Sequence, residues 1–326
     1  MKEQYAAELE SGARVDSVFA IRASEVRLAR TGEPYLWMEL ADRTGAIEAV
    51  RFRIASQDAP VPVGSVARVR GTVSMWRGGL SVRVSALEPA DSYDRGDLMP
   101  TTPQDTVALR RRLNQALASI GDRPLRALVH RVFADPGLAA RFAECPASVS
   151  GHHAYLGGLL EHTVAVVDAG DRLARCYPSV DRNLLTAAAL LHDIGMVDAL
   201  EFDTSVELSD RGRLLGHVNL GLARLESASA SAGSKPGARR FAELAHAVAA
   251  HHADLGAEWG PVTLEALLLS TADALDARVA SLVAGTSRAT RGGADWSDGS
   301  TFPRPLPAPR RRPAIDAVPG YLRAAG

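Results

Sequence analysis

The segment LLHDIGM, residues 190–196, places a histidine and an aspartate side by side inside an apolar run. Burying polar side chains such as His192 and Asp193 without partners would cost several kcal/mol each. Most of the nine histidines lie between residues 152 and 252, and a further aspartate follows in the apolar segment STADALDAR. The candidate ligands of a shared cation are His162, His192, Asp193, His217, His251, His252 and Asp273.

A divalent cation would remove this cost, because it turns buried imidazoles and carboxylates into ligands. One histidine in a helical core is usually just hydrogen-bonded, but five helical segments that each contribute such a group favour a metal centre. Mixed imidazole and carboxylate ligation suits Mn²⁺, Fe²⁺, Zn²⁺ or similar first-row ions, with weak discrimination among them. The two cysteines, Cys145 and Cys176, offer no paired thiolates, which argues against a closed structural zinc site.

Segments with helical spacing must position these ligands. In one of them Asp181 is the predicted cap and Gly195 the predicted end, so that His192 and Asp193 flank one seam. The segments are 155–174, 181–195, 216–226, 240–252 and 263–283. Three more histidines are expected at the edge of the site, where they contact substrate phosphate or support the ligands: His152 and His153, at a helix start, and His246.

Residues 15–90 have a different character, with five strand candidates separated by Gly, Pro and Asp turns. Such strands suit an antiparallel barrel of the OB type, which often binds oligonucleotides; a purely structural β-module is the alternative. Rings interleaved with arginines suit a single strand, because rings stack on bases and arginines meet phosphates. The predicted contacts are Arg51, Phe52, Arg53, Trp76 and Arg77. The alternative is that Phe52 belongs to the core and the arginines form a solvated face.

Length predicts two domains, since 326 residues exceed one domain of roughly 150, and the strand pattern followed by helical patterns predicts the α+β class. The apolar content of 46% is sufficient for two cores, and the net charge of −1 indicates no overall attraction to nucleic acid. No apolar leader or membrane-length apolar run is found, so we expect a cytoplasmic protein without membrane contact. The predicted parts are a five-stranded barrel at 12–92, a linker at 93–105, an all-α bundle at 106–284 and a disordered Pro/Arg-rich tail at 285–326.

The order H…HD…H…HH…D across five helices resembles the HD-domain superfamily of metal-dependent phosphohydrolases. The stretches HHAYLGGLLEHT, LLHDIG, GHVNLG and TLEALLLSTADALDA are more closely similar to the bacterial YhaM-type 3′-5′ exoribonucleases. Those proteins also carry an OB-fold ahead of the HD domain, and RTGAIEAV resembles their barrel. The resemblance covers about residues 12–284 and leaves the tail outside.

The resemblance implies one or two divalent ions, with Mn²⁺ preferred and Fe²⁺, Co²⁺, Zn²⁺ and Mg²⁺ as alternatives, and two sets of metal ligands. The minimal mononuclear set is His162, His192, Asp193 and Asp273. The residues at the positions of a second ion are His217, His251 and His252, with Asp193 as the bridging and catalytic residue. It further implies a hydrolase that releases 5′-mononucleotides from the 3′ end of single-stranded RNA, with single-stranded DNA as an alternative substrate. Self-association into a homo-oligomer is also implied.

Three positions depart from the family pattern. Met196 stands where the family usually has lysine, Ala253 where it has glycine, and Ser270 where it often has histidine. A lysine would help to neutralise the substrate phosphate, so its replacement by Met196 is expected to affect the rate or the substrate preference. Two other functions are therefore weighed: a phosphohydrolase that acts on a nucleotide or small phosphoester, and a non-catalytic RNA-binding protein whose metal site is structural.

Overall fold

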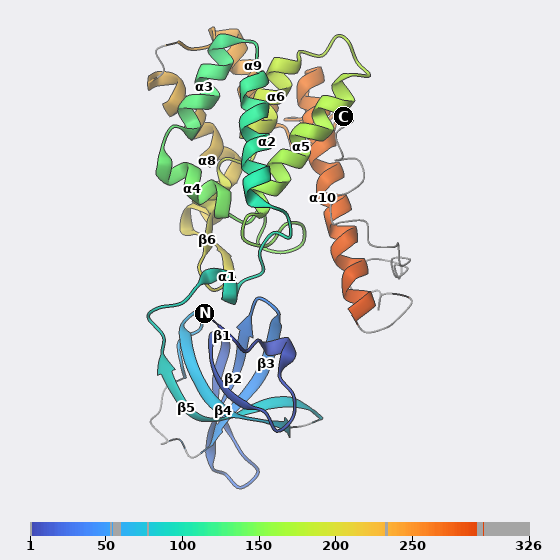
Figure 1. Cartoon of the computed structure of the whole chain (residues 1–326). Helices are drawn as coiled ribbons and strands as arrows, with labels where there is room; N and C mark the ends of the chain where they lie inside the picture. Colours follow the sequence, from blue (N-terminus) through green and yellow to red (C-terminus); the bar gives the residue numbers. More distant parts are fainter. Residues whose placement is uncertain are drawn as a thin grey trace. The chain divides into compact units, whose positions relative to one another are not determined.

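The chain forms a β-rich unit and a helical unit, which confirms the predicted α+β architecture (Figure 1). The structure is a computed structural model and describes residues 2–52, 54, 60–76, 78–231, 234–291 and 296, with the backbone alone for 285–291. The first unit comprises Met1–Thr101 with Phe202–Ser205, and the second comprises Thr102–Glu201 with Val206–Gly326.

The first unit is a closed five-stranded barrel in the order β1-β2-β3-β5-β4. Its strands are β1 (Arg14–Leu28), β2 (Pro34–Asp42), β3 (Gly45–Phe52), β4 (Val66–Trp76) and β5 (Gly79–Pro89). Alternate side chains such as Phe19, Met38 and Val69 fill the interior. The β4–β5 register shifts at Gly71, where a Cβ atom would lie 2.4 Å from the carbonyl oxygen of Arg83. Glycine therefore permits the bulge that helps the sheet to close.

The N-terminal segment packs against the barrel through a buried ion pair. The ammonium of Lys2 lies 2.8 Å from Asp42 Oδ2, donates to the carbonyl of Val18 and sits 3.8 Å from the centre of the Phe19 ring. A short 3-10 helix, η1 (Ala6–Glu8), follows. The backbone N–H of Ala6 donates to Asp42 Oδ2, and Thr44 donates twice to Asp42 Oδ1. Both oxygens of this carboxylate therefore have donors.

The second unit is a helical bundle in which α5 packs against α2, α4, α6 and α10. Its helices are α2 (Thr106–Ser119), α3 (Arg123–Phe133), α4 (Pro136–Glu144), α5 (Gly158–Ala174), α6 (Arg182–Leu191), α7 (Met196–Ala199), α8 (Asp210–Ser231), α9 (Ala238–Ala249) and α10 (Leu264–Arg291). Side chains of Asp105 and Asp181 cap α2 and α6, as their places before the apolar spacing predict.

Several element bounds differ from the sequence prediction. Helix α6 ends at Leu191 rather than at Gly195, because the chain turns there and restarts as α7. A two-stranded sheet, β6 (Leu200–Phe202) with β7 (Val206–Leu208), interrupts a region expected to be helical throughout. A short helix, α1 (Arg95–Leu98), lies within the predicted linker. Helix α10 runs past residue 284, and most of the predicted tail lies outside the described residues.

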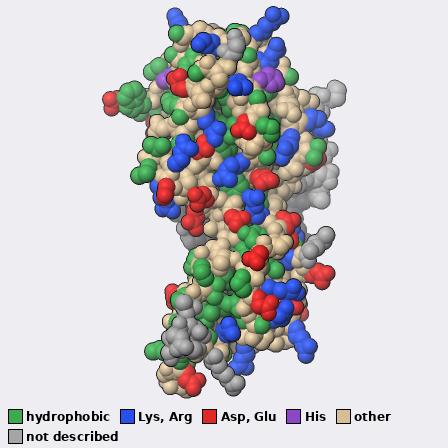
Figure 2. All heavy atoms as spheres, turned by 90° about the vertical axis from the view of Figure 1, so that its left-hand side faces the viewer, with side chains coloured by type: hydrophobic (Ala, Val, Ile, Leu, Met, Phe, Trp, Pro, Cys, Tyr) green, Lys and Arg blue, Asp and Glu red, His purple; other side chains and the backbone are tan. Residues whose placement is uncertain are grey.

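Charged side chains of both signs are mixed over the surface. On the face drawn in Figure 2, basic and acidic groups alternate rather than gather into one basic field. On the barrel, Arg68 and Arg70 both pair with Asp16. Within the described ranges, no helix combines the length and the apolar character needed to cross a bilayer.

Candidate metal centre

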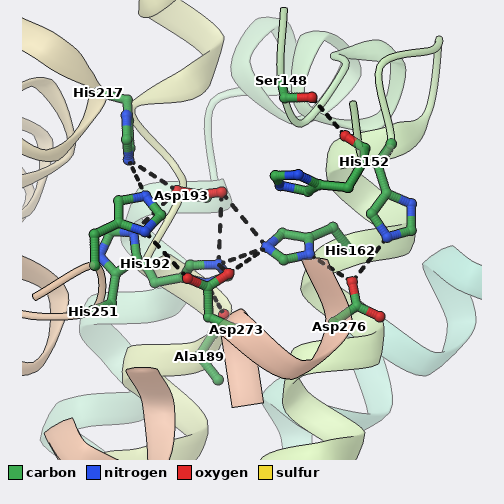
Figure 3. Close-up of polar contacts among 12 residues, drawn as sticks. Ser148, His152, His162, Ala189, His192, Asp193, His217, His251, Asp273 and Asp276 are labelled. Atoms are coloured by element: carbon green, nitrogen blue, oxygen red, sulfur yellow. Dashed lines mark hydrogen bonds and ion pairs between the residues drawn. The ribbon is translucent and has the colours of Figure 1, made fainter. Parts of the chain in front are cut away.

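All seven predicted ligands come together in one cluster inside the helical unit (Figure 3). His162 belongs to the second turn of α5, and His192 and Asp193 form the turn after α6. His217 follows a break in α8 at Gly216, where φ is +72°. His251 and His252 follow the end of α9, and Asp273 lies in α10. The helix ends thus bring polar side chains into an apolar interior.

Two of the rings are oriented by backbone carbonyls. Nδ1 of His192 lies 2.9 Å from the carbonyl oxygen of Ala189, and Nδ1 of His251 lies 2.6 Å from that of Val248. Because a carbonyl oxygen only accepts, each Nδ1 carries the proton and donates it. The lone pair of each Nε2 then faces the cluster, which is the orientation required of a metal ligand.

The carboxylate of Asp193 faces two separate groups of rings. Its Oδ2 lies 3.7 Å from Nε2 of His162 and from Nε2 of His192. Its Oδ1 lies 3.3 Å from Nε2 of His217 and 3.4 Å from Nε2 of His251. In Figure 3 the aspartate lies between His217 and His162. One carboxylate between two donor sets is the arrangement of a bridging ligand.

Asp273 joins the same two groups from the α10 side. Its Oδ1 lies 3.1 Å from Nε2 of His162, and its Oδ2 lies 3.3 Å from Nδ1 of His252. His252 also approaches His217, with 3.1 Å between their Nε2 atoms. The side chain of His252 is 52% exposed, against 0% for His162 and His192, so the cluster opens to solvent at His252.

Unpaired buried atoms show that this cluster could hold a cation. Among the described residues, four buried side-chain atoms lack a hydrogen-bond partner, and Asp193 Oδ1 and His251 Nε2 are two of them. These two atoms face each other, and both present lone pairs. A divalent cation between them would satisfy both, and imidazole nitrogen with carboxylate oxygen is a common ligand set for first-row divalent ions. The residues present therefore fit a metal.

The electrostatics of the cluster also favour positive charge. Burial disfavours a charged ring at His162, but the carboxylates of Asp273 and Asp276 outweigh it and raise the pKa of His162 to about 10. Burial lowers the pKa of His192 to about 4, which keeps that ring neutral. The pKa of Asp193 stays well below its usual value despite burial, because the surrounding imidazoles favour the carboxylate. The site thus holds ionised carboxylates beside a neutral imidazole.

Gly195 allows α8 to pack closely against the turn that carries His192 and Asp193. A Cβ atom at this position would lie 2.0 Å from the carbonyl oxygen of His217 and 2.5 Å from the backbone nitrogen of Gly221. Only glycine allows the backbones to pack this closely. The glycine of LLHDIG therefore positions His217 against Asp193 as well as ending the apolar run.

The three additional histidines predicted near the site lie at different places. His152 is half-buried, with its ring centre 5.8 Å from that of His162. His153 is buried and contacts Asp276 through Nε2 at 2.8 Å. Both lie in the loop before α5 rather than in its first turn. Nε2 of His246 accepts the backbone N–H of Val262, so this hydrogen bond joins the ring to a loop and not to the ligands.

Sequence reasoning missed Asp276, although it lies one helical turn after Asp273. Its Oδ2 lies 2.8 Å from Nδ1 of His162 and 2.8 Å from Nε2 of His153. The signal was the spacing DALD, because residues three apart share one face of a helix. Glu161 and Tyr155 were also missed; the Tyr155 hydroxyl donates to Glu161 Oε2 at 3.0 Å.

The described residues predicted to bind nucleic acid lie together on the barrel. Phe52 and Trp76 have ring centres 5.5 Å apart, and Tyr35 lies 5.7 Å from Phe52. Phe52 and Arg51 are half-buried, and the guanidinium of Arg83 lies 5.5 Å from the centre of the Phe52 ring. Arg53 and Arg77 lie outside the described residues. The three rings, from β2, β3 and β4, form an aromatic cluster at the ends of these strands.

Comparison with known families agrees with this architecture. The HD domain family matches residues 159–278, a range that contains all seven candidate ligands. The OB-fold nucleic acid binding domain family matches residues 18–90. This chain joins an OB-fold domain to an HD domain. The barrel is the centre of the first domain, and the candidate ligands lie within the second.

Curated relatives align with most of this chain. Proteins named 3′-5′ exoribonuclease YhaM are 28% identical in a Geobacillus species, 29% in Bacillus velezensis and 28% in Bacillus subtilis. Each match spans 278 residues and 83% of this chain, and covers 84% of the Geobacillus protein and 87% of each Bacillus protein. The similarity thus extends over both domains.

Proposed function

We propose that this protein is a metal-dependent 3′-5′ exoribonuclease that releases 5′-mononucleotides from single-stranded RNA. The observation that carries the proposal is the position of Asp193, whose two oxygens face separate groups of imidazoles. The similarity to exoribonucleases across both domains supports the same substrate class. Single-stranded DNA is the alternative substrate, and Mn²⁺ is the metal that we favour.

Two cations held by this cluster would stabilise the charge that develops on the attacking and leaving oxygens of a phosphodiester. In the proposal, His162, His192, Asp193 and Asp273 hold the first cation. The second is held by His217, His251 and His252, with Asp193 shared. Because His252 is the exposed member, the scissile phosphate enters at this edge. The imidazole of His152, whose pKa burial lowers, is neutral and contacts the substrate near His162.

The barrel would hold the RNA strand by stacking and charge. Tyr35, Phe52 and Trp76 offer rings from three neighbouring strands, and ring–base stacking tolerates any sequence. The guanidinium of Arg83 lies 5.5 Å from the centre of the Phe52 ring and would supply charge for phosphates beside the rings. Arg51 would add charge from the adjacent position of β3. Such contacts suit an enzyme that moves along a strand without reading its bases.

The proposal includes a cytoplasmic location. The two cysteines, Cys145 and Cys176, are free thiols, which fits a reducing compartment.

The direct experiment uses full-length protein, Mn²⁺ and a single-stranded RNA labelled at its 5′ end. We expect products that shorten stepwise from the 3′ end, with 5′-mononucleotides released. The variant Asp193→Ala removes the shared ligand and should lower the rate by at least about 10³-fold, since each cation supplies several kcal/mol of transition-state stabilisation. Full activity of this variant would contradict the proposed site.

The matched control is Asp171→Ala, which removes an aspartate of α5 that pairs with Arg175 and Arg182 outside the cluster. It should degrade RNA at the wild-type rate, because its ion pairs join it to two arginines and not to the ligands. A small phosphodiester, bis-p-nitrophenyl phosphate, distinguishes the exoribonuclease from a hydrolase that acts on small phosphoesters. If Trp76→Ala slowed the turnover of long RNA and of this ester equally, a small-phosphoester hydrolase with a structural barrel would replace the exoribonuclease.

A further inference from the structure

Asp276 is a carboxylate shared by a candidate ligand and by the loop beside it. Its Oδ2 lies 2.8 Å from Nδ1 of His162 on α5 and 2.8 Å from Nε2 of His153. The side chain is 13% exposed, and its carboxylate faces His162 from the side away from Asp193 (Figure 3). It therefore touches the metal cluster through another residue and not as one of the seven ligands.

The contact decides which nitrogen of His162 is available. An ionised carboxylate only accepts hydrogen bonds, so Nδ1 of His162 must carry the proton that it donates to Asp276. Nε2 is then the nitrogen left for a metal, and it lies 3.1 Å from Asp273 Oδ1. A cation bound there would displace the proton that Nε2 carries in the metal-free site. A carboxylate behind a metal-bound imidazole fixes the ring and makes it a stronger ligand.

His162 differs in this respect from the two rings that backbone carbonyls orient. His192 and His251 donate to the carbonyls of Ala189 and Val248, which no side-chain substitution removes. Only His162, among these three, is oriented by a side chain, and that side chain is charged. Its orientation can therefore be altered without changing a ligand.

The other partner of Asp276 belongs to a chain of polar contacts. Nδ1 of His153 lies 2.8 Å from the Tyr155 hydroxyl, which donates to Glu161. Glu161 also accepts from Thr102 Oγ1 at 2.5 Å and from Gln104 Nε2 at 2.8 Å. The chain runs from the metal cluster to the start of the helical unit and holds the loop that carries His152.

The backbone of His153, the residue whose ring contacts Asp276, has an uncommon conformation. His153 has a φ of +49°, which is uncommon outside glycine. A Cβ atom at Gly158 would lie 2.0 Å from the carbonyl oxygen of His153, so the glycine of α5 lets the loop approach closely. A strained residue kept in place by side-chain contacts often marks a functional position.

We propose that Asp276 is a positioning residue that fixes His162 as its Nδ1–H tautomer and anchors the His153 loop beside the metal. The inference rests on the proposed metal site and adds to it the residue that aims one ligand. Loss of a partner of this kind typically weakens metal binding by about 10–100-fold. Asp276→Ala should therefore lower the affinity for Mn²⁺ by this factor while all seven ligands remain.

The test combines metal titration with nuclear magnetic resonance on the full-length chain. Calorimetric titration with Mn²⁺ gives affinity and stoichiometry for wild type, Asp276→Ala, Asp276→Asn and the matched control His153→Ala. Histidine ring ¹⁵N spectra of the Zn²⁺-loaded protein show which ring nitrogens carry protons. Wild type should show a slowly exchanging Nδ1 proton on His162, and Asp276→Ala should lose it.

The two remaining variants separate positioning from general disruption. Asp276→Asn keeps an acceptor oxygen, so it should retain the His162 Nδ1 proton and bind Mn²⁺ with an affinity between wild type and Asp276→Ala. His153→Ala leaves the Asp276–His162 bond in place and should bind Mn²⁺ much as wild type does. Circular dichroism checks that each variant is folded.

Two results would overturn the inference. One is wild-type Mn²⁺ affinity with an unchanged His162 Nδ1 proton in folded Asp276→Ala. The other is the loss of one whole ion in both Asp276→Ala and His153→Ala, which would make His153, His162 and Asp276 a cation site of their own. Weakened Mn²⁺ binding and a lost Nδ1 proton would support the role of Asp276 even if wild type failed to degrade RNA, because neither measurement uses activity.

Discussion

Asp42 in the OB-fold domain and Asp193 in the HD domain are both buried carboxylates, with side chains 0% and 4% exposed. Both oxygens of Asp42 have donors, from Lys2, Ala6 and Thr44. Asp193 Oδ1 has no hydrogen-bond donor and faces imidazoles that turn lone pairs toward the cluster. The first is a completed structural pair, and the second needs a cation. Burial of a carboxylate alone therefore does not indicate a binding site. A buried carboxylate oxygen without a hydrogen-bond partner does.

The largest effect should come from breaking the completed pair. Asp42→Ala leaves the Lys2 ammonium buried without its partner, and removing one member of such a pair costs about 3–5 kcal/mol. We expect the OB-fold transition in urea to move by this amount while Mn²⁺ binding by the HD domain is retained. Far-ultraviolet circular dichroism with separate fits for the two domains measures it. If the unfolding transition of the OB-fold domain did not move, the ion pair of Asp42 with Lys2 would not stabilise that domain.

The second prediction concerns the incomplete cluster. Mn²⁺ at about 100 times its dissociation constant should stabilise the HD domain by about 2.7 kcal/mol, because only the folded cluster binds it. Asp193→Ala should lose most of this gain, whereas Asp42→Ala should keep it. Differential scanning calorimetry with and without the ion makes the comparison. Equal stabilisation of wild type and Asp193→Ala would place the ion elsewhere.

A smaller effect is expected where the barrel meets RNA. Trp76→Ala should weaken binding of single-stranded RNA by about 1–3 kcal/mol, the usual value of one stacked base. The matched control is Trp37→Ala, since Trp37 stacks on Arg27 rather than joining the aromatic cluster. Fluorescence anisotropy with a labelled oligoribonucleotide and inactive Asp193→Ala protein gives the affinities. Equal losses in both variants would contradict a role for the aromatic cluster.

The smallest effect is a pH dependence of the barrel. Burial raises the pKa of Asp42, but Lys2, Thr44 and the N–H of Ala6 outweigh it, so the folded pKa lies below the ordinary value. The stability from this ionised group is therefore present above a pH of about 4 and is lost as the pH falls through the folded pKa. Urea midpoints of the first transition should fall on acidification in wild type and less so in Asp42→Asn. If the urea midpoint changed with pH equally in wild type and in Asp42→Asn, Asp42 would not be the cause of the pH dependence.

Much of the barrel was predictable because local patterns determine it. The strand candidates, with turns such as TGEP and RTG between them, correspond to β1–β5. The structure also brings the seven candidate ligands together, since polar residues at apolar helix positions are a strong signal. That signal needs no knowledge of which helix contacts which.

The missed features depend on contacts between distant segments. Helix α6 ends at Leu191, and Gly195 packs against the backbone of α8; the local apolar run reveals neither. Asp276 reads as an ordinary helix-surface aspartate until α5 brings His162 against it. Lys2 is likewise indistinguishable from a solvated terminal lysine until Asp42 is in place.

The packing at Gly195 has a consequence for how this protein can change. Main chain touches main chain there, so no side chain separates the turn that carries Asp193 from the helical segment that begins with His217. Hydrophobic substitutions elsewhere around the cluster are therefore expected to change this spacing less than a methyl group added at residue 195 would. The spacing that the proposed chemistry needs is set by the absence of that single methyl group.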